Sequence, residues 1–239
     1  MIAPPVWVHE LAARFWATAG PPPAFPRDLT RAVTAALRLS LVGRPGLSLA
    51  VVRAYLDRLG VPVPFWGPDR PLRAALYCWR GTGFLFLDEN DPPAERRFSL
   101  AHEVAHYLRD CDDLRRRAVR ALGPAGLEIL NGRTPTTDER IAAVLRDLSL
   151  HPHAHLMSRN ADGRPSGEAE RDAESRADRL AFELLAPAEL LTDEHEPSAL
   201  VARLETVYGL PPAAARDYAT LLLPLPPLDP LLARLGGQV

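Results

Sequence analysis

Residues 96–108 of this chain are RRFSLAHEVAHYL, and within them His102-Glu103-Val104-Ala105-His106 places two histidines four positions apart. Residues four apart on an α-helix lie on one face, one turn from each other. That spacing lets two imidazole nitrogens reach one tetrahedral metal ion, and Glu103 follows the first histidine, where it can act on water without ligating. The pattern predicts a helix with two histidine ligands and a nearby base.

The flanking residues predict that this helix is buried. Residues 84–87 are an apolar run typical of a strand, and a loop rich in turn residues follows at 88–93. We expect the helix to begin near Ala94, with Pro93 in its first turn. Its apolar positions form a broad stripe: Phe98, Leu100, Ala101, Val104, Ala105 and Leu108. Buried histidines need polar partners, which are either a metal or, in the alternative interpretation, backbone carbonyls.

Composition narrows the classes of protein to consider. The chain has 239 residues, 28 basic and 30 acidic, for a net charge of -2, so it gives no reason to expect a nucleic-acid surface. Neither a signal peptide nor an apolar run of membrane-spanning length is evident, and we expect a cytoplasmic protein. Cys78 and Cys111 are far apart in sequence, and we expect them to be separate structural thiols rather than a zinc knuckle or a redox pair.

Helix and turn signals predict a mostly helical α+β protein with a single domain over 1–239. The expected segments are N-terminal helices (1–60), a hairpin and the HExxH helix (61–110), an insertion (111–167), further helices (168–222) and a tail (223–239). The expected helices lie at 6–19, 28–42, 48–59, 114–122, 125–130, 137–149, 168–185, 198–208 and 211–222, and the hairpin strands at 74–79 and 84–87.

A catalytic zinc site usually takes a third protein ligand. Glu174 is the best candidate, because Asp178 follows one turn later, where it could accept a hydrogen bond from a ligating imidazole. Glu170 and Glu183 are the fallback candidates. In the alternative interpretation, this helix has a merely solvated charged face.

A second group of histidines, His151, His153 and His155, alternates along the chain. On a strand all three would share one face, where they could bind a second metal or contact substrate. The alternative is a surface loop with solvated imidazoles.

Two motifs together resemble a known family. RRFSLAHEVAH resembles the "RFTLAHELGH" signature of the ImmA/IrrE-type metallopeptidases (peptidase family M78, the DUF955 group), and ESRADRLAFELLAP at 174–187 resembles that family's "ExxANxFAxxLLMP" segment. The resemblance covers residues 45–222. Departures are Asp178 for Asn, Leu180 for Phe and Ala186 for Met. A further departure is the 67 residues between His106 and Glu174, whose excess at 112–165 could cover the active-site cleft or carry a partner surface.

The resemblance implies a zincin-like domain with a small antiparallel sheet packed on the HExxH helix. His102, His106 and Glu174 would be zinc ligands and Glu103 the catalytic base. By the same resemblance, the chain would be a zinc-dependent endopeptidase that cleaves a helix-turn-helix repressor in a stress or mobile-element response. Two histidines and a glutamate favour zinc over manganese.

Two other functions remain open. One is a zinc-stabilised regulatory module that binds its partner without cleaving it. The other is a DNA-binding regulator with a helix-turn-helix at 47–63 or 198–222, against which the near-neutral charge counts. We therefore expect no direct nucleic-acid or membrane binding.

Overall fold

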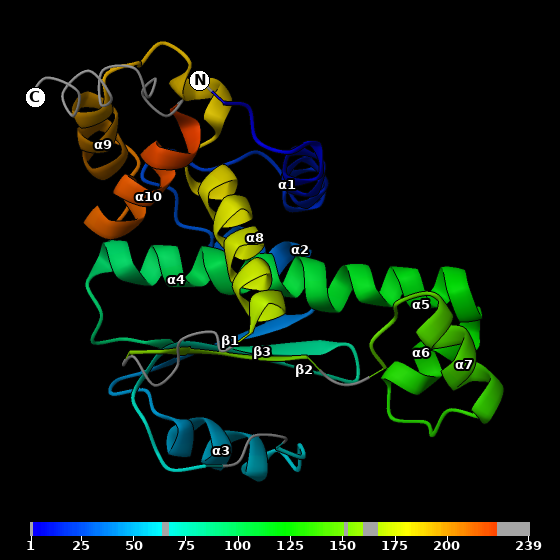
Figure 1. Cartoon of the computed structure of the whole chain (residues 1–239). Coiled ribbons are helices and arrows are strands. Elements are labelled where there is room, and N and C mark those ends of the chain that lie inside the picture. Colours follow the sequence, from blue (N-terminus) through cyan, green and yellow to red (C-terminus); the bar gives the residue numbers. More distant parts are fainter. Residues whose placement is uncertain (1, 64–66, 151–152, 160–166, 224–239) are drawn as a thin grey trace, which may run out of the picture.

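A buried helix, α4 (Pro93–His106), lies across one face of a four-stranded sheet in the computed structural model (Figure 1). The structure describes residues 2–63, 67–150, 153–159 and 167–223. Pro93 occupies the first helical position, where its missing N–H costs nothing, and Glu95 lies in the first turn, where its charge favours the helix dipole. All residues from Ser99 to His106 are buried. The prediction of a buried HExxH helix is confirmed.

The sheet has the order β1-β3-β2-β4. β2 (Leu72–Trp79) and β3 (Thr82–Asp88) form the predicted antiparallel hairpin, with Trp79 opposite Thr82. The two residues between the strands, Arg80 and Gly81, both have positive φ, as the two-residue turns that match strand twist require. β4 (Ala154–Ser158) pairs antiparallel with β2 and forms an edge of the sheet.

The helix predicted over 28–42 is wrong in its second half. α2 (Thr30–Ala36) ends early, and β1 (Leu39–Arg44) runs parallel to β3, with Leu41 opposite Leu85. A short apolar segment can fit the periodicity of a helix or that of a strand. Here, pairing with the edge of β3 makes it a strand. The sheet is therefore mixed rather than purely antiparallel, within a fold that is, as predicted, mostly helical α+β.

Strand alternation gives the sheet two apolar faces. Leu76 and Leu85 belong to the core that contains α4, whereas Ala75, Tyr77 and Phe86 pack with α3 (Leu49–Arg58) on the other face. Figure 1 shows α4 above the sheet and α3 below it.

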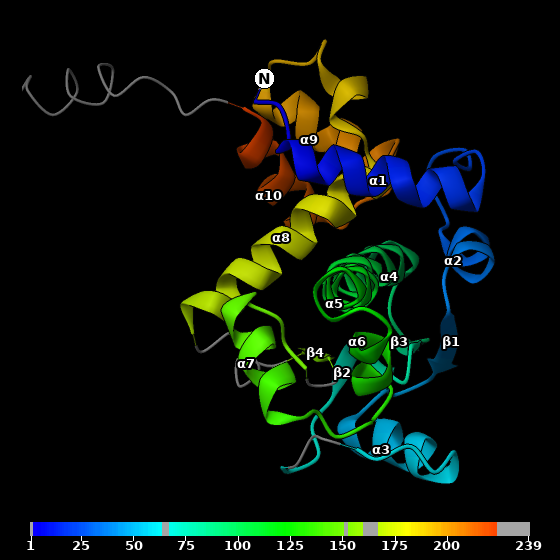
Figure 2. The ribbon, with the colours of Figure 1, turned by 90° about the vertical axis from the view of Figure 1, so that its right-hand side faces the viewer.

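α8 (Glu168–Leu185) crosses α4 on the side away from the sheet (Figure 1). Around its C-terminal end lie four further helices (Figure 2): α1 (Val6–Ala19), η3 (Ala188–Leu191), α9 (Pro197–Thr206) and α10 (Pro212–Leu222). The helices predicted at 6–19, 48–59, 168–185, 198–208 and 211–222 are confirmed to within a few residues. The predicted tail lies outside the described residues from 224 onward.

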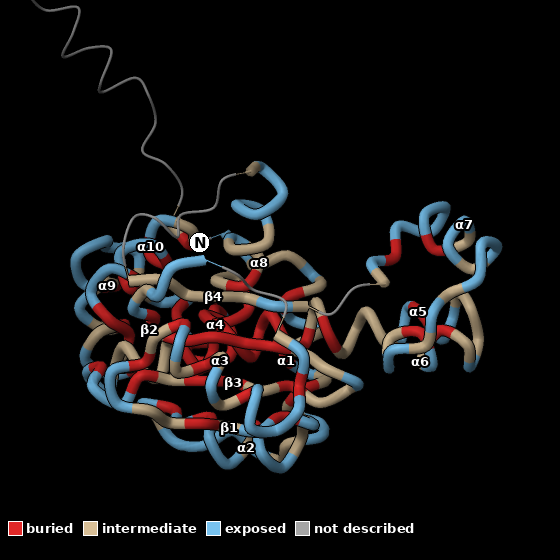
Figure 3. The backbone as a smooth tube through the Cα atoms, turned by 90° about the horizontal axis from the view of Figure 1, so that it is seen from below, coloured by how far each residue is buried: buried red, intermediate tan, exposed pale blue. Residues whose placement is uncertain are grey.

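The chain continues from α4 into a π-helix, η1 (Tyr107–Asp113), and then into α5 (Leu114–Leu122), α6 (Pro124–Leu130) and α7 (Thr137–Leu145). These three helices stand apart from the rest of the molecule (Figure 3), and the chain then returns to β4 beside β2. Within the predicted insertion, strand β4 is thus part of the sheet on which α4 packs. In the part of the chain that the structure describes, none of the helices is long and apolar enough to span a membrane.

Candidate metal centre

α4 places both histidines of the HExxH motif on one buried face. His102 and His106 are 2% and 1% exposed, and their Nε2 atoms lie 3.2 Å apart. The two side chains converge because the four-residue spacing of the motif corresponds to about one helical turn. The predicted pair of convergent imidazoles is therefore present.

α8 brings the two acidic residues predicted from its sequence to His102. Glu174 Oε2 lies 3.2 Å from His102 Nε2, and Glu174 Oε1 lies 3.5 Å from His106 Nε2. Asp178, one turn later on α8, accepts a hydrogen bond from His102 Nδ1 at 2.8 Å. α8 crosses α4 at this point. The four-residue spacing on each helix therefore places Glu174 beside the Nε2 atoms of His102 and His106, and Asp178 beside Nδ1 of His102.

β4 adds His155, which the sequence offered only as one of three candidates. Its Nδ1 lies 2.9 Å and 3.0 Å from the two carboxylate oxygens of Glu103, and its Nε2 lies 3.0 Å from Glu174 Oε1. His153 lies on the same side of the sheet, 3.8 Å from Asp110, while His151 lies outside the described residues. The alternative of solvated loop histidines is therefore wrong for His153 and His155.

Each of three histidines has a carboxylate at Nδ1. A carboxylate only accepts hydrogen bonds, so these contacts assign the hydrogen to Nδ1 and leave a lone pair on each Nε2. The pairs are His102 with Asp178, His106 with Asp110 at 3.0 Å, and His155 with Glu103. With neutral imidazoles, the Nε2 lone pairs and the Glu174 carboxylate converge on one point, an arrangement that favours a positive charge there, either protons on the rings or a bound metal ion.

The neighbouring carboxylates raise the pKa values of His102 and His155, which favours the positively charged imidazoles. Burial alone would lower the pKa of His102, but hydrogen bonds to Asp178 and Glu174 outweigh it and raise the pKa to about 9. For His155, burial is likewise outweighed, by the charge of Glu103, and the pKa rises to about 10. Burial would raise the pKa of Glu174, yet hydrogen bonds from the histidines hold it far below its ordinary value.

The distances fit a tetrahedral metal. Two ligands each at about 2.0–2.1 Å from zinc in tetrahedral geometry are about 3.4 Å apart. The two Nε2 atoms of His102 and His106 are 3.2 Å apart, and the Nε2 atoms of His102, His106 and His155 lie 3.2, 3.5 and 3.0 Å from the nearer oxygen of Glu174. The group of residues whose ligand atoms all lie within 4.8 Å of one another is His102, His106, His155 and Glu174. These residues could hold one metal ion.

A second group shares one of these histidines. His106, Asp110 and His153 also have ligand atoms within 4.8 Å of one another. Burial lowers the pKa of His153 to about 4, so this imidazole is neutral, and its Nε2 has no hydrogen-bond partner. However, Asp110 already accepts a hydrogen bond from His106 Nδ1, whereas Glu174 faces only Nε2 atoms, so the first group fits a metal better.

The fallback candidates for the third ligand lie outside the convergent group. Glu183 accepts a hydrogen bond from the backbone N–H of Ala188 and lies 3.7 Å from His9. Glu170 lies in the first turn of α8. Asp110 is the carboxylate that sequence reasoning missed, although it follows His106 by four residues, the same spacing that identified Asp178.

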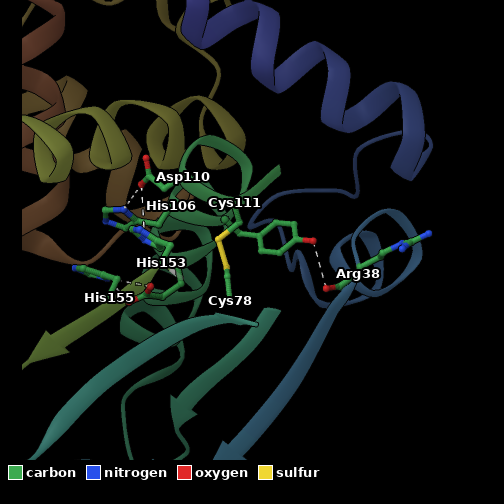
Figure 4. Close-up of a disulfide and its surroundings, with 9 residues drawn as sticks. Arg38, Cys78, His106, Asp110, Cys111, His153 and His155 are labelled. Atoms are coloured by element: carbon green, nitrogen blue, oxygen red, sulfur yellow. Dashed lines mark hydrogen bonds and ion pairs between the residues drawn. A yellow bond between two sulfur atoms is a disulfide. The ribbon is translucent and has the colours of Figure 1, made fainter. Parts of the chain in front are cut away.

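The expectation of two separate thiols is wrong. Cys78 on β2 and Cys111 on η1 form a disulfide across 33 positions of sequence (Figure 4). The hairpin and the continuation of α4 meet only in the folded chain, so the sequence separation concealed the pair. Figure 4 shows the bond beside Asp110, His106 and His153.

One family model matches the chain, that of Peptidase_M78, the IrrE N-terminal-like domain, over residues 57–125. The match contains the hairpin, the HExxH helix and η1, and it ends before Glu174. No curated protein matches the sequence. Over this part of the chain, the match supports the resemblance to the ImmA/IrrE-type M78 peptidases that the two motifs indicated.

Proposed function

We propose that this protein is a zinc-dependent endopeptidase whose metal is held by His102, His106 and Glu174. The observation that carries the proposal is the convergence of the Nε2 atoms of His102 and His106 and the Glu174 carboxylate on one buried point. Zinc suits two or more imidazoles with one carboxylate better than manganese does. The match to the M78 peptidase model over residues 57–125 supports a peptide substrate.

The side chains have distinct tasks in this proposal. Asp178 and Asp110 hold His102 and His106 in the tautomer that presents Nε2. A bound Zn²⁺ supplies Lewis acidity and makes water a nucleophile at neutral pH. The Glu103 carboxylate accepts the proton of the attacking water and delivers it to the leaving amine.

The Glu103 carboxylate is buried but ionised. It is 0% exposed, and burial would raise its pKa, but the charges of His155, His106 and His102 lower it. The carboxylate is therefore kept ionised although it is buried, which a general base requires.

The substrate we propose is a helix-turn-helix repressor of a stress or mobile-element response. This part rests on the resemblance of RRFSLAHEVAH and ESRADRLAFELLAP to the ImmA/IrrE motifs. A repressor encoded beside this gene is the first substrate to test.

Glu103→Gln is the decisive variant. It keeps the size of the side chain and removes the base, so we expect unchanged zinc content and a loss of repressor cleavage on the order of 10²–10⁴-fold. Cleavage is followed by gel electrophoresis and mass spectrometry of the products, and metal content by elemental analysis. Glu128→Gln, on α6, makes the same chemical change away from the site and should cut like the wild type. Equal cleavage by the Glu103→Gln protein would contradict the proposed mechanism.

A zinc-stabilised module that binds without cutting is the second candidate. It is favoured by the engagement of both Glu103 oxygens with His155, which occupies the proposed base. Stable capture of the repressor by wild-type and Glu103→Gln proteins alike, without products, would favour this candidate.

The cytoplasmic location stays a prediction. The disulfide between Cys78 and Cys111 weighs against it, since thiols in a reducing compartment are generally kept reduced.

A further inference from the structure

We propose that His155 is a fourth protein ligand of the metal centre, and that it closes the centre in the conformation seen here. The proposal rests on the proposed function, because it concerns the same metal. Neither the HExxH motif nor the α8 motif contains this residue, which comes from strand β4.

The register of β4 directs His155 to the metal centre. His155 lies opposite Leu76 of β2, and cross-strand neighbours share a face of the sheet. Leu76 belongs to the core that contains α4, so His155 faces the HExxH helix. Leu156, the next residue, packs in the core on the α3 side. A shift of the register by one residue would remove the imidazole from the site.

The ring of His155 is fixed among the proposed ligands. It stacks on the ring of His106 with 4.0 Å between centroids and 25° between planes, and its centroid lies 5.4 Å from that of His102. Its Nε2 lies 3.0 Å from Glu174 Oε1, a separation close to that of two ligands of one tetrahedral ion. The side chain of His155 is 15% exposed. It is therefore already in place to ligate.

The partner of its other nitrogen completes the argument. Metal-ligating histidines commonly donate the second ring N–H to a carboxylate. His102 and His106 do so to Asp178 and Asp110, and His155 does so to Glu103. The same arrangement at all three rings points to the same task, ligation through Nε2.

A closed centre has two consequences for hydrolysis. Three imidazoles and Glu174 would supply the four ligands that zinc commonly takes and would leave no position for water. The same imidazole also holds the carboxylate of Glu103. Peptide hydrolysis therefore requires His155 to withdraw, and β4 is suited to this because it is an edge strand that, among the described strands, pairs only with β2.

Cobalt substitution tests the proposal directly. Co²⁺ replaces Zn²⁺ in the full-length wild-type protein, and its visible absorption reports the number of ligands. We then add acetohydroxamate, a small ligand for an open metal position. We expect the wild-type spectrum to remain unchanged at concentrations that alter the spectra of His155→Ala and His155→Gln, with at least a tenfold difference in half-saturation. The proposal would be overturned if the wild type bound acetohydroxamate as tightly as the two variants do. It would also be overturned if none of the three proteins bound acetohydroxamate.

Zinc affinity provides a second measurement, by competition with a chromophoric chelator. We expect His155→Ala and His155→Gln to bind zinc at least tenfold more weakly than the wild type. His153→Ala is the matched control, because it removes a neighbouring imidazole from the same side of the sheet but keeps all four proposed ligands. Should His153→Ala weaken binding while the His155 variants do not, the metal would belong to the group of His106, Asp110 and His153, and the proposal would fail.

The outcomes separate the two proposals. A wild-type protein that binds no zinc contradicts the peptidase proposal as well as this one. A protein that binds zinc and cleaves its repressor, but whose affinity and cobalt spectrum do not depend on His155, contradicts only the fourth ligand.

Discussion

At the scale of single residues, the proposed ligands depend on the carboxylates behind them. Asp178 accepts from His102 Nδ1 at 2.8 Å, and this contact decides which nitrogen of the ring carries the lone pair. Without the carboxylate, the ring loses both its fixed tautomer and part of its basicity.

We therefore expect Asp178→Ala to lower zinc affinity by about 10–100-fold, the usual effect of removing such a carboxylate. Chelator competition measures the change. Asp172→Ala is the control, since Asp172 lies on the same helix with a 65% exposed side chain near Arg176. Equal affinities for the two variants would show that Asp178 does not orient His102.

At the scale of elements, the disulfide fastens the hairpin to the end of the HExxH helix. Cys78 precedes the turn between β2 and β3, and Cys111 lies in η1. η1 also carries Asp110, the partner of His106. The bond thus restrains the segment that supports one ligand of the proposed metal centre.

Closing a loop of 33 positions in the unfolded chain predicts a stabilisation of about 3–4 kcal/mol from chain entropy. We expect the double variant Cys78→Ala, Cys111→Ala to lose about this free energy of unfolding, measured by urea denaturation under non-reducing conditions. Wild type unfolded in the presence of a strong reductant should approach the variant. If the reductant has no effect on the wild type, the bond does not contribute to stability.

At the scale of the whole molecule, the proposed metal centre joins three elements that are distant in the sequence: α4, β4 and α8. The unfolded chain does not present these ligands together. Metal binding at this proposed centre would therefore be coupled to the native fold, and its free energy would add to the stability of that fold.

Removing the metal should consequently lower the melting temperature. Zinc at about 1,000 times its dissociation constant would stabilise the native state by about 4 kcal/mol, and in a chain of this size each kcal/mol shifts the melting temperature by about 2–4 °C. Calorimetry with and without a chelator measures the shift. A His102→Ala protein should melt at the same temperature in both conditions, and a wild-type protein that does so contradicts a metal-coupled fold.

Much of the proposed centre followed from local spacing. His102 and His106, and Glu174 and Asp178, are pairs four residues apart on helices, and an isolated helix already places such pairs on one face. The helix boundaries near Pro93 and Pro187 are equally local, because proline excludes a continued helix. Asp110 had the same spacing from His106 and could have been predicted by the same argument.

The remaining features depend on contacts between distant segments. β1 became a strand because β3 offered it an edge, and Cys78 met Cys111 because the hairpin packs against the end of α4. His155 could be assigned a face only once its register opposite Leu76 was known. The sequence by itself thus determined which helices carry the proposed ligands His102, His106 and Glu174, since helical periodicity is local. Only the tertiary structure decided that β4 brings a further imidazole to Glu103 and Glu174, since strand pairing is not local.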